Sequence, residues 1–128
     1  MPRISVCIPA YNRPGELKIL LNSILNQDYD EYEIVVSDDN SPLSEEIRVA
    51  IDHFIKKYPK KTIRYFKNNK NLGYDANLRF LIERAEGEYC LFMRNDDLLY
   101  IDALSKIVSV LEYCYGLSKM GLWTNKFF

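Results

Sequence analysis

Short apolar runs alternate with longer amphipathic segments along the whole chain. The runs are rich in β-branched and aromatic residues, which predicts buried β-strands. These strands lie at residues 4–8, 32–37, 63–66 and 89–93. Elsewhere apolar residues recur every three or four positions, which predicts amphipathic helices. The helices centre on residues 17–25, 47–58, 74–85 and 104–111.

Prolines and glycines mark several of the expected boundaries. Pro14 suits the first turn of a helix, Pro59 ends the second helix, and Gly87 follows the third. Residues 121–123 (GLW) indicate the start of a fifth strand. Because the chain has no internal repeat, linker or low-complexity stretch, the pattern predicts one domain over residues 1–128.

Strands separated by helices of this length predict a parallel α/β sheet with right-handed crossovers and helices on both faces. In such sheets, ligands bind beyond the carboxyl ends of the strands, where the strand order reverses. Each predicted strand is followed by a polar cluster. These clusters occupy residues 10–13, 38–41, 68–73 and 94–97. Four polar clusters at one edge predict a binding site there.

Two of the clusters contain adjacent aspartates, at 38–39 and 96–97. Their mutual repulsion is offset by a hard divalent cation with oxygen ligands, which a diphosphate would share. Tyr11 offers a flat face for a base, and Asp39 offers acceptors for a base or ribose. Gly73 permits close backbone approach before a helix N-terminus, which favours phosphate. The alternatives are that both aspartate pairs only form turns or helix caps, and that Tyr11 packs in the core.

Charge and cysteine content narrow the class of protein. Seventeen Lys and Arg residues balance eighteen Asp and Glu residues, giving a net charge of −1, which argues against a generally basic nucleic-acid binder. The basic segment 56–61 (KKYPKK) is interpreted as a solvated helix end, with contact to an anionic membrane as the alternative. Cys7 and Cys90 are expected to be buried free thiols. With no signal peptide and no apolar run of ~20 residues, a cytoplasmic location is expected, with peripheral membrane association as an alternative.

Residues 4–12 (ISVCIPAYN) and 33–41 (EIVVSDDNS) resemble the start of the family 2 inverting glycosyltransferases. Residues 71–74 with Asn77, and residues 85–89, continue the resemblance. The tripeptide 95–97 (NDD) is similar to that family's DxD-type metal motif. The resemblance implies the GT-A fold, a Rossmann-like parallel sheet flanked by helices that binds a nucleoside-diphosphate sugar, with a UDP-sugar favoured.

The resemblance also implies roles for individual residues. Tyr11 would stack on uracil or another base, and Asp39 would bind the base or ribose. Asp96 would face the ribose and diphosphate, while Asp97 would ligate Mn²⁺ or Mg²⁺, with Asp96 as the second metal residue. The full nucleotide-binding set predicted in this way is Pro9, Tyr11, Asn12, Asp38, Asp39, Asn71, Gly73, Asn77, Arg94 and Asp96.

The chain departs from the family pattern in two ways. Arg94 stands where many members have an acidic residue, and it would reach a phosphate instead. The family's general base and acceptor pocket come later in the sequence, and no acidic residue follows Glu112. We therefore expect no catalytic base in this chain, which would be a truncated donor-binding domain or one completed by a homodimer partner or another chain.

The expected reaction is inverting transfer of a sugar to a saccharide or lipid-linked acceptor, in cell-surface polysaccharide or glycoconjugate synthesis. The alternative is a truncated, inactive domain for nucleotide binding or assembly. Other α/β nucleotide enzymes fit less well, since neither a G-x-G-x-x-G turn nor a P-loop is present.

Overall fold

Four parallel strands form the sheet in the computed structural model, which describes residues 2–119 and the side chains of residues 2–115. The strands are β1 (Ile4–Ala10), β2 (Tyr32–Asp38), β3 (Thr62–Lys67) and β4 (Tyr89–Phe92). They lie in the order β3-β2-β1-β4. The helices are α1 (Pro14–Leu25), α2 (Ser44–Lys57), α3 (Tyr74–Arg84) and α4 (Ala103–Lys119). The prediction of a parallel α/β fold is confirmed.

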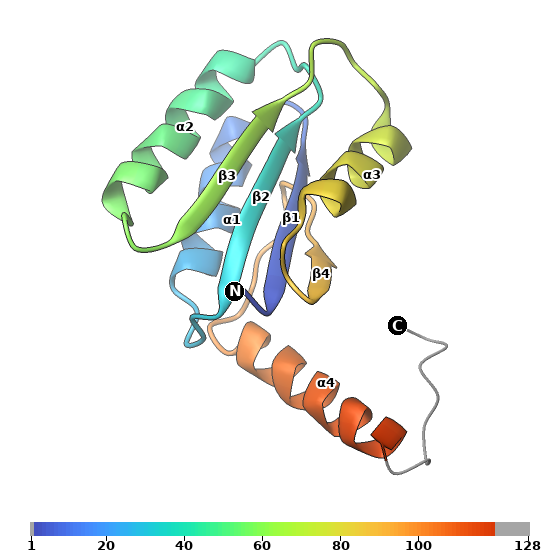
Figure 1. The fold of residues 1–128 in the computed structure, drawn as a ribbon. Coiled ribbons are helices and arrows are strands. Elements are labelled where there is room, and N and C mark those ends of the chain that lie inside the picture. Colours follow the sequence, from blue (N-terminus) through green and yellow to red (C-terminus); the bar gives the residue numbers. More distant parts are fainter. Residues whose placement is uncertain (1, 120–128) are drawn as a thin grey trace.

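The direction of chain travel across the sheet decides which helix covers which face. From β1 to β3 the chain moves in one direction, which places α1 and α2 on the same face. The return to β4 reverses that direction and places α3 on the opposite face (Figure 1). The larger core lies on the α1–α2 face and includes Val6, Ile34, Leu20 and Leu104, so α4 contributes to it as well.

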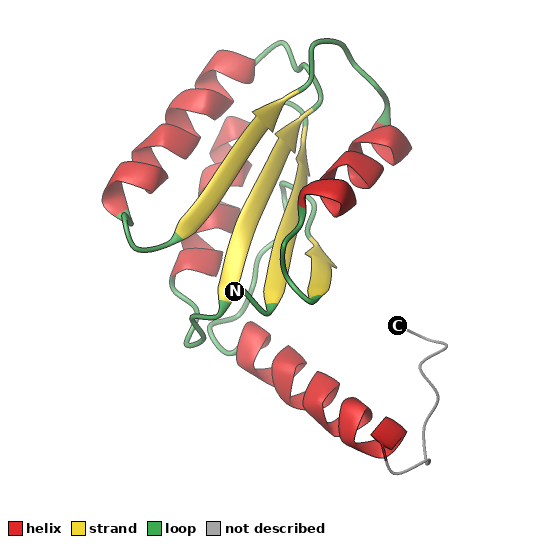
Figure 2. Cartoon of the chain, in the orientation of Figure 1, coloured by secondary structure: helices red, strands yellow, loops and turns green. Residues whose placement is uncertain are grey.

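The α3 face is covered less completely, as the secondary-structure colouring shows (Figure 2). The helix packs on β1 and β2, where Cys7, Val35 and Leu81 form a small second core. On β4 the same face is open. Cys90 is therefore exposed, and the expectation that it is buried is wrong; Cys7 is buried as expected, and both thiols are free. Ile82 on α3 is 53% exposed, whereas Leu81 beside it is fully buried.

Pairing within the sheet extends some of the predicted elements. β1 stays in register with β2 through Pro9 and Ala10, two residues beyond the predicted end of the first strand. The fifth strand predicted at 121–123 lies outside the described residues.

Among residues 2–119, no helix is both long enough and apolar enough to cross a bilayer.

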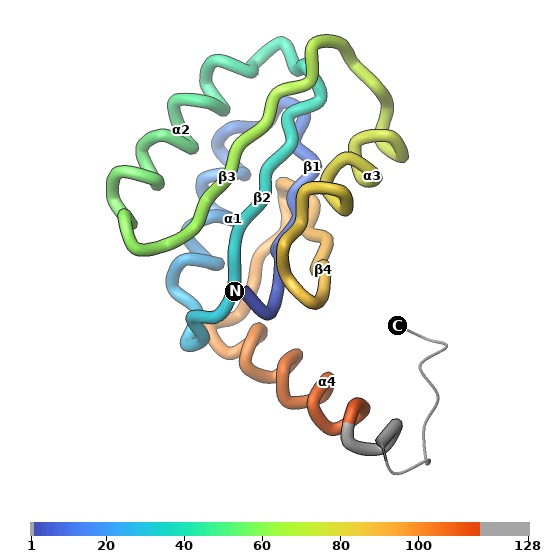
Figure 3. The backbone as a smooth tube through the Cα atoms, viewed as in Figure 1, coloured from blue at the N-terminus to red at the C-terminus, as the bar shows by residue number. Residues whose placement is uncertain are grey.

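The carboxyl ends of the strands meet at one edge of the sheet. Figure 3 shows the chain turning back at this edge after β2 and after β3. The strand order reverses between β1 and β4, because β2 and β4 flank β1 on either side. The switch point predicted from the sequence therefore lies at the ends of β1 and β4.

Candidate functional site

A pocket of about 250 Å³ lies at the carboxyl ends of β1 and β2, beside the start of α3. It is lined by Pro9, Ala10, Tyr11, Asp39, Asn71, Gly73, Tyr74 and Asn77. Most of these residues were predicted to bind a nucleotide, and three separate loops bring them together. Ala10 and Tyr74 also line the pocket, although neither belongs to the predicted nucleotide-binding set.

Asp39 builds one wall of the pocket by holding the loop that precedes α3. Its Oδ1 accepts hydrogen bonds from the Leu72 amide at 2.8 Å and from Asn68 Nδ2 at 2.9 Å. Its Oδ2 accepts the Gly73 amide at 3.0 Å. The Asp39 amide in turn donates to the carbonyl of Ala10 at 3.0 Å. The carboxylate thus fixes loop 68–73 against the end of β1.

A buried network of polar side chains supports this wall from below. Asn77 Oδ1 accepts from Ser37 Oγ at 2.6 Å and from Asn68 Nδ2 at 3.0 Å. Asn77 Nδ2 donates to the Ser37 carbonyl at 3.0 Å. Because buried hydrogen bonds with all partners present specify one arrangement, the network fixes α3 relative to β2 and β3. Ser37 and Asn68 are therefore positioning residues that sequence reasoning did not identify.

Asp38 is not part of the pocket wall. Its side chain is fully buried, with Oδ1 accepting the Ser41 amide at 3.0 Å and Oδ2 accepting the Tyr65 hydroxyl at 3.1 Å. Burial, and then the charge of Asp38, raise the pKa of Tyr65 above its ordinary value. This placement fits the alternative in which Asp38 forms a turn. It does not cap α2, which follows Leu43.

Two tyrosines stand at the pocket with much of their side chains in solvent. Tyr11 is 46% exposed and Tyr74 is 60% exposed. Neither is a core residue, so the packing alternative for Tyr11 does not describe its position. Both offer an amphipathic ring to a planar group. The signal that could have found Tyr74 is its place directly after the glycine that opens α3.

The loops around the pocket carry the left-handed backbone conformations of the described chain. Asn12 has φ of 56° and Arg13 of 54° after β1, and Asn40 has φ of 56° after β2. Gly73 has φ of 92° after β3. An added Cβ on Gly73 would meet nothing within 4 Å, so its conformation calls for glycine and crowding does not. Residues with strained backbone conformations are common at binding sites, where the surrounding structure holds them in place.

The turn at 94–97, after β4, lies next to the loop after β1. Asn95 Nδ2 donates to the carbonyls of Asn12 at 3.0 Å and Tyr11 at 3.4 Å. Within the turn, Asp97 Oδ2 accepts the Arg94 amide at 2.9 Å. These bonds place the turn that carries both aspartates next to the loop that carries Tyr11.

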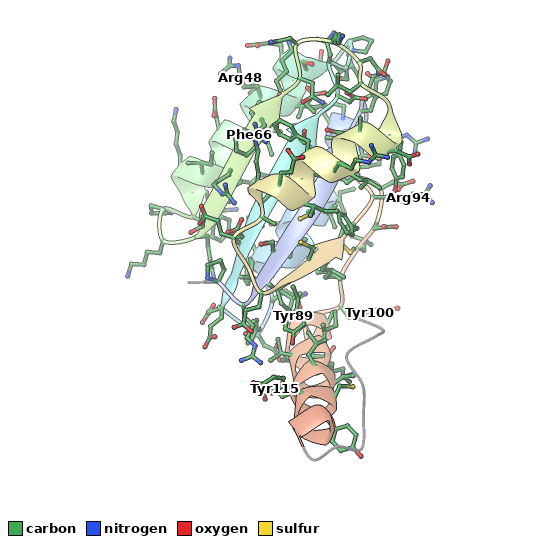
Figure 4. The ribbon with its side chains drawn as sticks, turned by 45° about the vertical axis from the view of Figure 1, so that its right-hand side comes forward. Arg48, Phe66, Tyr89, Arg94, Tyr100 and Tyr115 are labelled. Atoms are coloured by element: carbon green, nitrogen blue, oxygen red, sulfur yellow. The ribbon has the colours of Figure 1, made fainter. Side chains whose placement is uncertain are left out.

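Asp96 lies between two arginines. Arg13 Nη1 is 3.0 Å from Asp96 Oδ2, and Arg94 Nε is 3.8 Å from Asp96 Oδ1. Most of the Arg94 side chain is exposed to solvent, and it extends outward from the molecule (Figure 4). The predicted acidic motif is therefore a mixed cluster of two carboxylates and two guanidinium groups, which suits an anion as well as a cation.

The donor set of this turn fits Mn²⁺ or Mg²⁺ shared with a ligand. Asp96 and Asp97 supply carboxylate oxygens, which these ions prefer. The described residues contain no cluster of three or more His, Cys, Asp or Glu side chains placed to hold a metal. Two carboxylates are nevertheless sufficient where phosphate and water complete the shell. A cation at Asp96 has to compete with Arg13.

Known proteins resemble this chain in both sequence and fold. The sequence profile of Glycosyl transferase family 2 matches residues 5–119. A Campylobacter jejuni protein, the GalNAc(5)-diNAcBac-PP-undecaprenol beta-1,3-glucosyltransferase, is 37% identical over 117 residues, covering 91% of this chain and 37% of that protein.

Two solved structures carry the same fold. TarS 1–349 of S. aureus in complex with UDP has a TM-score of 0.74 at 27% identity, covering 88% of this chain and 33% of TarS. The mannosyltransferase PcManGT of Pyrobaculum calidifontis, solved with GDP-Man and Mn²⁺, has a TM-score of 0.70 at 25% identity, covering 76% of this chain and 28% of that protein.

The chain spans about a third of the length of these proteins. Apart from Ile4, the first residue of β1, the matched segment nevertheless includes all four described strands and the four loops at their carboxyl edge. The chain belongs to glycosyltransferase family 2.

Proposed function

We propose that the pocket at the carboxyl edge of the sheet binds a nucleoside-diphosphate sugar together with a divalent metal ion, as the donor site of a glycosyltransferase. The supporting observation is the convergence of Tyr11, Asp39 and Gly73 in one pocket with Asp96 and Asp97 on the adjoining turn. The base would stack on Tyr11, with Tyr74 closing the pocket beside it. The diphosphate would extend toward the 94–97 turn.

Asp39 indicates which bases the site accepts. Its carboxylate is an acceptor only, so it suits a base that offers a ring N–H. Uracil and guanine offer one, whereas cytosine and adenine present a ring acceptor. This agrees with structural neighbours that were solved with UDP and with GDP-Man. We take UDP as the favoured nucleotide, since the neighbour with the higher TM-score of these two was solved with it.

In the mechanism that we propose, two carboxylates position a metal ion, and the metal and two arginines stabilise the charge of the diphosphate. Asp96 and Asp97 would hold the metal, with Asp96 also facing the ribose. When bound, that metal would offset the negative charge that grows on the departing diphosphate during inverting transfer. Arg13 and Arg94 would face the same diphosphate from either side of Asp96. No residue of this chain is assigned as the general base.

The acceptor that we propose is a saccharide, carried by a lipid or a polymer. The support is the Campylobacter jejuni relative, whose name gives a glycan on undecaprenyl pyrophosphate as its substrate. Such an acceptor would bring the chain to the cytoplasmic surface of a membrane. A role in cell-surface polysaccharide or glycoconjugate synthesis would follow.

Calorimetric titration of UDP, with and without Mn²⁺, tests donor binding. We expect heat only when the metal is present, because two carboxylates and a diphosphate repel one another without it. At UDP ~100-fold above its dissociation constant, the free energy of unfolding should rise by about 2.7 kcal/mol. If saturating UDP with Mn²⁺ gives neither heat nor a melting shift, and GDP gives none either, the proposal fails.

Asp97→Asn tests the metal ligand without breaking the turn. The asparagine keeps an oxygen for the Arg94 amide but removes the charge that would hold the cation. Removing even an outer partner of a metal ligand costs about 10–100-fold in metal affinity, so we expect at least that loss of Mn²⁺-dependent UDP binding. Asp75→Asn, on the exposed first turn of α3, is the matched control. Equal UDP–Mn²⁺ affinity in the two variants would show that Asp97 is not a ligand.

A further inference from the structure

A second hollow lies on the α3 face of β3, and its volume is about 550 Å³. We call it the β3–α3 groove. The side chains that define it are Phe66, Lys67, Lys70, Phe80 and Arg84. It shares no lining residue with the pocket beside Tyr11, from which loop 68–73 separates it. The proposed donor site therefore leaves it without a role.

The groove exists because α3 does not reach the edge strand. The helix packs on β1 and β2, so side chains on its outer side extend over β3. Phe80 and Arg84, one helical turn apart, do this. Phe66 rises from β3 to meet them, with its ring 5.6 Å from that of Phe80 in an edge-to-face arrangement. Figure 4 shows Phe66 beside the ribbon of α3.

Arg84 is held in this groove by aromatic rings. Its guanidinium carbon is 3.4 Å from the centre of the Phe80 ring and 5.1 Å from that of Phe66. Stacking orients a guanidinium while leaving its N–H groups at the edge, available to a planar or tetrahedral anion. The side chain of Arg84 is thus pre-organised for a ligand.

In the described part of the chain, no carboxylate forms an ion pair with the cations of the groove. No Asp or Glu lines the groove, and none of the recorded ion pairs includes Lys67, Lys70 or Arg84. The pKa of Glu45 is lowered, chiefly by its hydrogen bond and charge interaction with Arg48 and to a smaller extent by Lys67. Arg48 already holds both oxygens of that carboxylate, at 2.5 and 3.1 Å.

We infer that the β3–α3 groove binds a phosphate group that is attached to an apolar body. The two lysines and Arg84 supply charge-assisted donors, and a guanidinium offers a phosphate two parallel hydrogen bonds. Phe66, Phe80 and Leu72, which is 41% exposed, supply an apolar wall for the attached group. A membrane phospholipid headgroup and a soluble phosphoester both have this chemistry.

Amide NMR spectra of the full chain, recorded in EDTA so that no metal binds at Asp96 and Asp97, test the inference. The probes are inorganic phosphate and dihexanoyl phosphatidic acid. We expect both to shift the amides of residues 67–70 and 84, with tighter binding of the phosphatidic acid because it adds apolar contact. Co-sedimentation with phosphatidylglycerol vesicles but not phosphatidylcholine vesicles would identify a lipid source. Binding of the soluble probes alone would identify a free phosphoester.

The Lys67→Gln/Lys70→Gln variant is expected to weaken phosphatidic acid binding by about tenfold or more, since two charge-assisted contacts are lost. Lys18→Gln/Lys106→Gln makes the same change of charge on exposed lysines outside the groove and should change affinity less than about twofold. UDP–Mn²⁺ binding should survive in both variants, so this test is independent of the donor site. Equal losses in the two variants, shifts confined to the pocket beside Tyr11, or no binding would overturn the inference.

Discussion

Asp38 and Asp39 are chemically identical neighbours with different positions in the structure. Asp38 is the last residue of β2, and its carboxylate is fully buried against Ser41 and Tyr65. Asp39 begins the loop and faces the pocket. Successive side chains of an extended strand point to opposite sides, and at the end of β2 the Asp38 side chain lies on the buried side while Asp39 lies at the pocket. A sequence shows the pair of carboxylates but not which of them reaches the site.

Gly73 offers a test of a single residue at the pocket. Its positive φ strains any residue with a Cβ, although the space around it is empty. With φ of 92° and ψ of 162°, Gly73 lies in a region that essentially only glycine adopts. We expect Gly73→Ala to lower the free energy of unfolding by about 1–3 kcal/mol, and to weaken UDP binding because loop 71–73 moves. Urea unfolding and calorimetry measure the two effects.

Gly15 is the matched control for this substitution. It also has nothing within 4 Å of an added Cβ, but it lies in the first turn of α1 without a positive φ. Gly15→Ala should therefore raise the free energy of unfolding by about 0.4–1 kcal/mol. If both substitutions change stability in the same direction, backbone conformation is not what requires glycine at position 73.

At the scale of elements, the edge strand β3 is tied to the sheet by a buried ion pair. Arg64 on β3 hydrogen-bonds Glu33 on β2, whose side chain is only 1% exposed. Arg64 also donates to the carbonyl of Arg84 at 2.5 Å, which connects β3 to the end of α3. Removing one partner of a buried pair leaves an uncompensated charge, which costs far more than losing an exposed pair.

We therefore expect Arg64→Met to lower the free energy of unfolding by about 3–5 kcal/mol in urea titrations. The double variant Glu33→Gln/Arg64→Met should recover much of this loss, because no charge then stays buried. Arg48→Gln removes an arginine that pairs only with exposed carboxylates on α2, and it should have little effect. A loss for Arg64→Met no larger than that for Arg48→Gln would contradict this account of β3.

The elements themselves were predictable, because their apolar residues repeat with the period of a strand or a helix. The coverage of the sheet was not. Cys90 is exposed because α3 covers β1 and β2 and leaves β4 open, and this follows from the reversal of strand order before β4. No local sequence pattern around Cys90 indicates that reversal. The same uneven coverage leaves the β3–α3 groove open.

At the scale of the whole molecule, the general position of the site followed from topology. In a parallel sheet all carboxyl ends share one edge, so the four polar clusters had to lie near one another. The bonds that join them could not be predicted, because they link residues far apart in sequence. Asn95 to Asn12 and Asn68 to Asp39 are two such bonds. Ser37 and Asn68 were missed because their roles depend on such distant partners.

The central claim is that these clusters form one site for a nucleotide and a metal. Amide NMR spectra of the chain titrated with UDP and Mg²⁺ test it most directly, since they locate the ligand residue by residue. The account predicts shifts that share one saturation curve at residues 10–13, 39, 71–74 and 94–97, and almost none at Lys61 or Gly87, which lie at the opposite ends of the strands. Shifts confined to one of these loops, gathered at the amino ends of the strands, or absent at saturating UDP–Mg²⁺ would contradict it.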